Sequence, residues 1–464
     1  MKESTYLGAA ETATRIRSGR LSPVDAVEVC LRRIETLDDK LRAWATVSKR
    51  AALDTARALE RELEERGPRG PLHGIPVGVK DVYYTAGVKT SAGSKLCEDF
   101  VPEYSATAVR RLESAGAIVL GKTACTEFAA NDPAPTRNPW NLDHTPGGSS
   151  SGSAAAVAAR TCFVTLDTQT AGDILRPAAY NGVVGLKPSY GRISRRGTIP
   201  VAWSLDTGGV MARSVEDAAL ALGVLAGHDP EDQSSSSGPV RDYVSTSRGW
   251  SDPPTLGLLR RYFYDHASEK VREHTERVVD LLGSAGARIE EVEPPEDLGL
   301  VYAAHRTVVF SECAAYHQET FRQRPEDYGP KLRQLIELGQ ATPAVSYIQA
   351  QRLRRRFARR LGETLHGVDA FITATTPTTA PSDLSETGDR RFQIPWTFAG
   401  VPAINMPSGL DRSGLPFGIQ LIGALFAEDR LLATAYWCEK ALSVDLSPPP
   451  RGATKDLEAV REGR

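Results

Sequence analysis

Residues 145–153 read TPGGSSSGS and are followed at once by AAAVAA at 154–159. Where a Gly/Ser-rich loop opens a helix, free backbone N–H groups point outward and can bind an anion or a carbonyl oxygen. A flexible linker has a similar composition, but the alanine-rich helix directly behind the loop argues against one. The loop also lacks the Gly-Lys-Ser/Thr ending of a phosphate-binding P-loop. The stretch therefore predicts a functional loop at the start of a packed helix.

The sequence around this loop has the texture of an α/β protein. Between residues 74 and 227, short apolar runs such as IVL at 118–120 and FVTL at 163–166 alternate with Gly/Ser/Pro clusters and with helical stretches. Strands that alternate with helices indicate an α/β architecture. Further core strands are predicted at residues 255–259, 371–373 and 402–406. Residues 229–254 are polar and turn-rich, and they predict an exposed loop.

Helices are predicted at the N-terminus and in the basic run at residues 351–360. Ser22 and Pro23 form a cap and first position for a helix whose apolar positions Val27, Cys30, Leu31 and Ile34 share one face. A second helix is predicted over residues 51–66. The run QRLRRRFARR at 351–360 contains two apolar residues at i, i+4 spacing, so it predicts an amphipathic helix with a solvated basic face.

Composition excludes several classes of protein. The chain has 464 residues, 41% hydrophobic and 25% charged, and a net charge of −2, without the basic excess of a nucleic-acid binder. Its six cysteines show no C-x-x-C pair, which favours a reducing compartment over a disulfide framework or a zinc site. No apolar run is long enough for a membrane span, and the N-terminus has no signal core. We expect a cytoplasmic protein without nucleic-acid or membrane partners.

Five further segments, together with the serine loop, resemble the amidase signature family in order and separation. They are GIPVGVKD at 74–81, TRNPW at 136–140, GVVGLKPSYG at 182–191, AGVPAI at 399–404 and GLPFGIQLIG at 414–423. The similarity runs from about residue 5 to 445 and is loose over 230–365. It implies one α/β domain with a mixed central sheet wrapped by helices.

Within that domain the resemblance divides the chain into regions. They are N-terminal helices packed on the core (1–70), the amidase signature core (70–227), a variable insert region (228–367), the C-terminal part of the core (368–446) and a disordered tail (447–464).

The resemblance also implies a Ser–Ser–Lys triad that cleaves amides. The family's lysine falls on Lys80, and its bridging serine, held by a cis peptide, falls on Ser149. A desolvated lysine with a lowered pKa can take a proton through the bridging hydroxyl, while backbone N–H groups stabilise the oxyanion. The positions expected to bind substrate are Gly148, Ser150, Ser151, Thr170, Ala171 and Gly172.

The nucleophile is where this sequence departs from the family. The family's loop, G-T-D-T-G-G-S-I-R-x-P-A, aligns without gaps on DTQTAGDILRPA at 167–178, so the serine position is Asp173. The spacing of 24 residues from Ser149 agrees with the family, and no serine lies between Ser153 and Ser189. Three neighbours differ as well: Gln169 replaces an aspartate, Ala171 a glycine and Leu175 an arginine. Several linked changes indicate natural divergence.

A carboxylate has no proton to give, so Lys80 cannot act as a base on residue 173. The opposite charge is expected to keep Lys80 protonated, and the loop N–H groups are expected to lower the pKa of Asp173. A hydrogen-bonded ion pair Lys80–Ser149–Asp173 is predicted. Ordinary serine hydrolysis is then excluded, and with it a role as the amidotransferase subunit that delivers ammonia to a charged tRNA.

Three functions remain from the residues alone. The leading hypothesis is an enzyme of small-molecule or secondary metabolism that uses Lys80, Ser149 and Asp173 for acid/base or carboxylate chemistry, in an elimination, cyclisation, ring opening or isomerisation. The second is a non-catalytic ligand-binding homologue. The third is an amide or ester hydrolase with a water activated by Asp173.

Lys80 and Ser149 favour an enzyme, because a decayed pocket has no need of a lysine facing a buried acid. Neither a dinucleotide fingerprint nor metal-ligand histidine spacing is present, so no cofactor or metal is expected. The expected partner is a small-molecule substrate, and the resemblance adds a possible homodimer.

Overall fold

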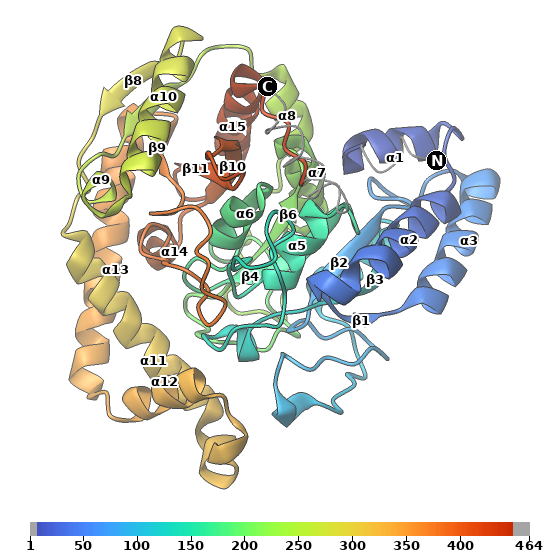
Figure 1. Ribbon diagram of the computed structural model, residues 1–464, viewed down its shortest axis with the longest axis horizontal. Helices are drawn as coiled ribbons and strands as arrows, with labels where there is room; N and C mark the ends of the chain where they lie inside the picture. Colours follow the sequence, from blue (N-terminus) through green and yellow to red (C-terminus); the bar gives the residue numbers. More distant parts are fainter. Residues whose placement is uncertain (1–6, 449–464) are drawn as a thin grey trace, which may run out of the picture.

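The structure, a computed structural model, describes residues 7–448 (Figure 1). One mixed sheet of eleven strands runs through these residues in the order β1-β3-β2-β4-β6-β5-β10-β11-β9-β7-β8. The strands are β1 (Trp44–Val47), β2 (Pro76–Lys80), β3 (Ile118–Thr123), β4 (Val164–Gln169), β5 (Val184–Lys187), β6 (Thr207–Ala212), β7 (Thr255–Leu258), β8 (Arg288–Glu291), β9 (Ala370–Ala374), β10 (Ala403–Leu410) and β11 (Pro416–Ile422). The predicted single α/β domain with a mixed sheet is confirmed.

Helices surround this sheet (Figure 1). They are α1 (Ala9–Arg17), α2 (Pro23–Leu41), α3 (Lys49–Arg66), α4 (Thr107–Ser114), α5 (Ser151–Ala158), α6 (Leu175–Asn181), α7 (Val215–Leu225), α8 (Tyr243–Gly249), α9 (Phe263–His266), α10 (Glu269–Ser284), α11 (Leu298–Gln323), α12 (Pro330–Gln340), α13 (Ala344–Thr364), α14 (Ile394–Ala399) and α15 (Glu428–Leu442). Among the described residues, no helix is long and apolar enough to cross a membrane.

The predicted N-terminal helices are confirmed. Ser22 caps α2, because its side-chain oxygen accepts the Val24 N–H at 2.9 Å and Pro23 occupies the first helical position. The predicted apolar face is buried throughout: Val27, Cys30, Leu31 and Ile34. The alanine-rich helix α5 is buried along its whole length, which explains why it carries small residues instead of an amphipathic pattern.

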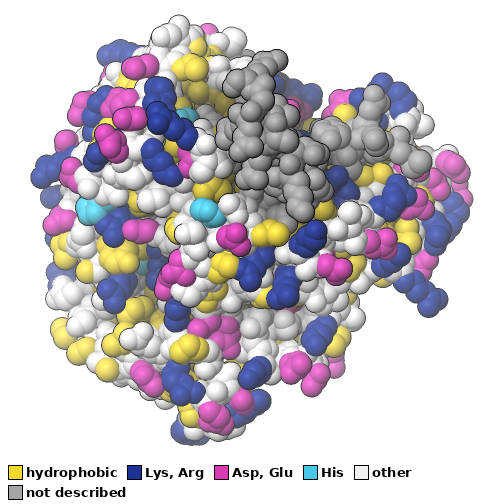
Figure 2. All heavy atoms as spheres, viewed as in Figure 1, with side chains coloured by type: hydrophobic (Ala, Val, Ile, Leu, Met, Phe, Trp, Pro, Cys, Tyr) yellow, Lys and Arg dark blue, Asp and Glu magenta, His cyan; other side chains and the backbone are white. Residues whose placement is uncertain are grey.

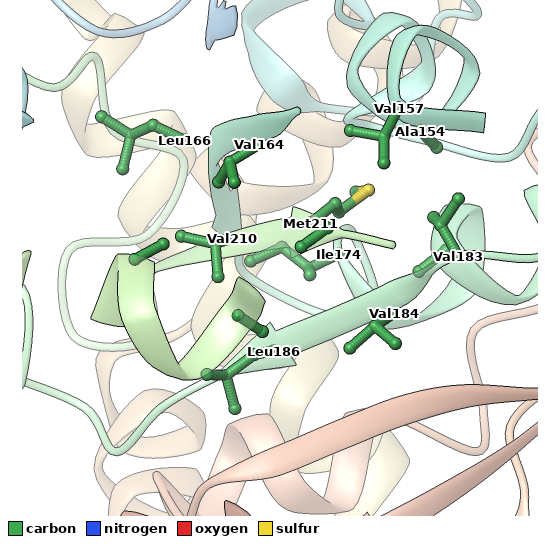
Figure 3. Packing of buried hydrophobic residues seen from close by; sticks show 14 of the residues in the cluster. Ala154, Val157, Val164, Leu166, Ile174, Val183, Val184, Leu186, Val210 and Met211 are labelled. Atoms are coloured by element: carbon green, nitrogen blue, oxygen red, sulfur yellow. The ribbon is translucent and has the colours of Figure 1, made fainter. Parts of the chain in front are cut away.

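The centre of the sheet determines where the functional residues lie. Strand β2 pairs in parallel with both β3 and β4, so the carboxyl ends of these three strands meet at one edge. The core beside them is packed by apolar residues of α5, β4, β5 and β6, among them Val157, Leu166, Leu186 and Val210 (Figure 3). Loops that leave this edge are therefore held on a rigid base.

Residues 229–254 are not simply an exposed loop, and that prediction is wrong over α8. Tyr243 and Ser247 of α8 are buried, and the helix packs against α7 and α15. Asp242 begins it by accepting the Ser245 N–H at 3.0 Å. The stretch is polar overall, so its composition did not indicate this helix of seven residues, which packs through one buried aromatic side chain.

The basic run at 351–360 lies in α13, and the predicted amphipathic helix is confirmed. Leu353 and Phe357 are buried and pack with residues of α11 and α14 in a second hydrophobic cluster. Residues 228–367 supply β7 and β8 to the edge of the same sheet. The predicted disordered tail lies, from residue 449 onward, outside the described residues.

Candidate active site

Lys80 lies at the end of β2, a strand buried at all five positions. Its Nζ donates to Ser149 Oγ at 2.7 Å, to Thr168 Oγ1 at 2.9 Å and to Thr168 O at 3.3 Å. Thr168 belongs to the neighbouring parallel strand β4, so the sheet itself sets this contact. Burial lowers the pKa of Lys80, and the nearby Asp173 carboxylate partly opposes that shift.

Ser149 follows a cis peptide between Gly148 and Ser149. The loop is packed so closely that a Cβ atom on Gly148 would come within 2.7 Å of the Thr387 side chain. Arg176, buried on α6, donates from Nη2 to the Gly148 carbonyl at 2.6 Å. The expected convergence of the lysine and the bridging serine, with a cis bond in the serine loop, agrees with this geometry.

Asp173 lies between β4 and α6, with its carboxylate bound by three backbone N–H groups. Oδ2 accepts from Thr170 at 2.9 Å and from Ala171 at 2.8 Å, and Oδ1 accepts from Ser149 at 3.2 Å. Gly172 lies against Gln393, and a Cβ at that position would come within 2.5 Å of Gln393 Oε1, so the Gln393 side chain would have to shift. The carboxylate thus occupies the loop N–H groups that the family resemblance assigns to an oxyanion. We call these three N–H groups the N–H cradle.

The electrostatics of the site agree with an ionised Asp173. Burial raises the pKa of Asp173, but the charges of Lys80 and Arg176 and the N–H bonds lower it more, so the net shift is downward as predicted. At Lys80 the Asp173 carboxylate raises the pKa, in the predicted direction, but burial lowers it more, so the net shift of the Lys80 pKa is downward. The link from Ser149 to Asp173 uses the serine's backbone N–H instead of its hydroxyl.

A small cavity lies in front of Asp173. Its volume is about 20 Å³, room for about one water molecule. Asp173 lines this cavity, whereas Lys80 and Ser149 are not among its lining residues. His305 and Arg306 of helix α11 line it together with Arg390 and Asn131. Within the described residues, Asp173 is therefore the member of the predicted triad that meets the cavity.

The cavity wall is ordered by two side chains from distant segments. His305 Nε2 donates to the Thr170 carbonyl at 2.9 Å, and burial lowers the pKa of this histidine to about 4, so it is neutral at pH 7. Arg390 donates to Asn131 Oδ1 at 2.8 Å. The wall is cationic as well as apolar, because Arg306 and Arg390 line the cavity together with Ala129, Ala130 and Phe310.

The predicted substrate-binding positions fall into two groups. Thr170 and Ala171 line the cavity and donate to Asp173. The other four are buried but do not line it: Gly148, Ser150, Ser151 and Gly172. Ser151, at the start of α5, donates from Oγ to the Gly147 carbonyl at 2.6 Å, so it closes the serine loop.

Sequence reasoning missed three residues that shape the site: Arg176, His305 and Arg390. Two of them come from segments without a motif, so no local pattern could have found them. Arg176 could have been found, because it stands one position after Leu175, where the family has its arginine. The departure at Gln169 is also accommodated: its Oε1 accepts the N–H groups of Ile174 and Leu175 at the start of α6. Among the described residues, no group of three His, Cys, Asp or Glu side chains could hold a metal ion.

The site consists of a buried lysine that bonds to a serine after a cis peptide, at the carboxyl edge of a large mixed sheet. This arrangement defines the amide-cleaving class of α/β proteins that the sequence resembles. A profile of the Amidase family matches residues 25–432, and the chain belongs to this family.

Relatives and solved structures cover nearly the whole chain. A glutamyl-tRNA(Gln) amidotransferase subunit from Geobacter metallireducens is 37% identical, over 93% of this chain and 96% of its own. The structure of the corresponding subunit from Thermotoga maritima is 30% identical, with a TM-score of 0.79, over 93% of this chain and 94% of its own. A protein of a vestigial complex linked to the origins of an s-triazine catabolic enzyme is 31% identical, with a TM-score of 0.89, over 96% and 100%.

These relatives overturn the functions predicted from Asp173. The sequence favoured an enzyme of secondary metabolism, with a ligand-binding homologue and an Asp173-activated hydrolase as alternatives. Relatives that align over more than nine-tenths of the chain are instead named as amidotransferase subunits. The prediction went wrong because it inferred the whole function from one residue of the site and gave too little weight to similarity along the rest of the chain.

Proposed function

We propose that this chain is the amidase-type subunit of an amidotransferase-like complex, and that it releases the nitrogen of a carboxamide at the Lys80–Ser149–Asp173 site. The observation that carries the proposal is the 2.7 Å contact between Lys80 Nζ and Ser149 Oγ, buried at the carboxyl end of β2. The names of the relatives support the class of reaction and the presence of other subunits. The small-molecule partner predicted from the sequence becomes the carboxamide of this proposal.

The proposal gives each of the three residues a part. Asp173 is the group that meets the substrate, because it is the one of the three that lines the cavity. The Asp173 carboxylate attacks the carboxamide carbon to form an acyl anhydride, and the C–N bond breaks. Lys80 supplies the proton with which the nitrogen leaves as ammonia, since its lowered pKa eases proton release. Water then hydrolyses the anhydride, which restores Asp173 and returns a proton to Lys80. Ser149 positions the lysine and relays its proton. A substrate carbonyl oxygen would compete with Asp173 for the N–H groups of Thr170 and Ala171.

The enzyme is proposed not to be a standard serine amidase. In such an enzyme a serine at position 173 would be acylated, and this chain has a carboxylate there. Serine-directed fluorophosphonates are therefore expected to leave the protein unlabelled. The Asp173→Ser variant supplies the positive control, because it restores a hydroxyl beside an intact Lys80–Ser149 pair and is expected to become labelled.

The experiment measures ammonia release from glutamine, asparagine and a peptide amide. We expect Lys80→Met to abolish release and Asp173→Asn to lower it at least tenfold, about 1.4 kcal/mol in activation free energy. Lys89→Met, at an exposed lysine, is the matched control and is expected to keep the parent rate. A parent rate that survives Lys80→Met, or labelling of Ser149, Ser150 or Ser151 in the parent, would contradict the proposal.

The expected cellular location follows from the same proposal. The six cysteines are all free thiols, and five of them are buried. Free thiols on this scale suit a reducing compartment. We propose that the chain acts in the cytoplasm, as the sequence predicted.

A further inference from the structure

A second hollow, much larger than the one at Asp173, lies between helices α11 and α13. It is a groove of about 940 Å³. Leu300 and Ala303 of α11 and Val345 and Leu353 of α13 line it. Leu300 is 49% exposed and Val345 is 64% exposed. Large apolar side chains gathered on one open groove indicate a surface that another molecule covers.

One wall of this groove is strongly basic. Helix α13 carries six arginines and a single glutamate, and Arg352, Arg355, Arg356 and Arg359 line the groove. On the side of the molecule formed by α11 to α13, hydrophobic and basic side chains lie next to one another (Figure 2). Apolar contact and positive charge are thus offered on the same surface.

The ion pairs at the groove leave two of these arginines available. Arg356 bonds to Glu296 at 2.8 Å, and Arg359 lies 3.9 Å from Glu363. Arg352 and Arg355 are exposed and have no acidic partner within the described part of the chain. They stand three residues apart, so they project from neighbouring turns of one helix face. Two free cations at this spacing match carboxylates on a second helix lying in the groove.

We propose that this groove binds an acidic amphipathic helix of another protein. Its apolar side chains would cover Leu300, Ala303 and Val345, and its carboxylates would pair with Arg352 and Arg355. This is the helix-in-groove mode of recognition, in which apolar residues anchor and flanking charges select the partner. The inference rests on the groove alone and stands whether or not the proposed amide chemistry is correct.

Two other occupants fit the surface less well. The groove floor is apolar, and a nucleic acid that bound the arginines through phosphates would leave Leu300 and Val345 uncovered. The chain's own C-terminal segment, residues 451–464, carries four basic and three acidic residues, so it lacks the negative charge that this wall selects. An acidic amphipathic helix covers the apolar side chains of Leu300 and Val345 and also pairs with the arginines of α13.

The test measures binding of a fluorescent probe peptide by anisotropy. The probe is a capped helix of about 18 residues with leucines at i, i+3, i+4 and i+7 spacing and glutamates on its flanks. Its counterpart keeps the leucines and carries lysines instead. We expect the glutamate probe to bind, the lysine probe to bind at least tenfold more weakly, and added salt to weaken binding of the glutamate probe.

Variants locate the binding. Two groove variants are tested. One is the double variant Arg352→Glu with Arg355→Glu, and the other is Ala303→Trp, whose indole ring fills the apolar part of the groove. Each is expected to weaken binding of the glutamate probe about tenfold or more. The matched control reverses two exposed arginines elsewhere, Arg50→Glu with Arg412→Glu, and is expected to bind as the parent does. Neither groove variant touches Lys80, Ser149 or Asp173, and a circular dichroism spectrum and melting temperature equal to those of the parent report separately that each variant is folded.

Four outcomes would overturn the proposal. The first is that the glutamate probe does not bind, and the second is that it binds the groove variants as well as it binds the parent. The third is that a short RNA duplex binds more tightly than the glutamate probe, through Arg352 and Arg355. The fourth is that the protein forms a concentration-dependent dimer that the groove variants abolish. The last two would assign the groove to a nucleic acid or to a second copy of this chain.

Discussion

At the scale of single residues, Asp173 is both the departure from the family and the centre of the N–H cradle. Removing its carboxylate in Asp173→Ala leaves the N–H groups of Ser149, Thr170 and Ala171 without their acceptor. An unsatisfied buried donor costs about 1–3 kcal/mol, so the variant is expected to lose about 2 kcal/mol or more of unfolding free energy. Formate, which presents the same two oxygens, is expected to bind the vacated cradle and raise the melting temperature again.

The measurement compares thermal unfolding in formate and in chloride at equal ionic strength. Leu175→Ala is the matched control, because it destabilises a fully buried neighbour without vacating an anion site. Formate that stabilised the parent or Leu175→Ala as much as Asp173→Ala would show that the cradle is not the binding site.

The residues that the sequence could place are those held by spacing within motifs. Lys80, Ser149 and Asp173 were found because three linear motifs carry them. The balance at Lys80 between burial and the Asp173 charge could not be predicted, because burial depends on the packing of β2, β3 and β4 and no motif records it. The position of Asp173 on backbone N–H groups, with Ser149 as one donor, likewise depends on the fold of two loops.

At the scale of elements, helix α11 connects the cavity with the groove. His305 faces the cavity, whereas Ala303 and Thr307 line the groove. The helix also buries a second histidine, His317, whose ring lies 4.7 Å from that of Phe128. No motif indicated this double role, because α11 lies where the family resemblance is loose.

The two buried histidines make α11 sensitive to acid. Burial lowers the pKa of both His305 and His317 to about 4, whereas an unfolded histidine has a pKa near 6.5. The unfolded chain therefore binds more protons between these values. The stabilisation is complete above about pH 6.5 and is lost as the pH falls toward 4. From pH 7 to 5 we expect each histidine to cost about 1–2 kcal/mol.

Urea unfolding of the parent and of His317→Phe at pH 7 and pH 5 measures this effect. The variant keeps an aromatic ring against Phe128 but cannot take up a proton, so the difference between the two pH values is expected to shrink. His366→Phe, at an exposed histidine, is expected to keep the parent's difference. An unchanged difference in His317→Phe would show that this histidine is not the group that titrates.

At the scale of the whole molecule, the strands lie in a different order in the sheet from their order along the chain, so the last strands of the chain pair with earlier ones. The last three strands along the chain, β9, β10 and β11, lie between β5 and β7 in the sheet. The sequence predicted a variable region at 228–367 and a separate C-terminal part of the core, and it identified most of these strands. It could not reveal their order, because pairing between strands hundreds of residues apart leaves no local pattern.

This strand order predicts that the chain folds as one unit. A truncated chain ending at residue 367 would lose β9, β10 and β11, so β5 would lose its antiparallel partner β10 and β7 would be cut off from the rest of the sheet. Such exposed apolar edges aggregate. We expect the truncated chain to be insoluble, and the full chain to unfold in a single calorimetric transition.

Co-expression of the truncated chain with residues 368–464 is the control, since it restores every strand without restoring the peptide bond. A soluble 1–367 fragment with a cooperative melt, or two separate transitions in the full chain, would show that the segments before and after residue 367 fold independently.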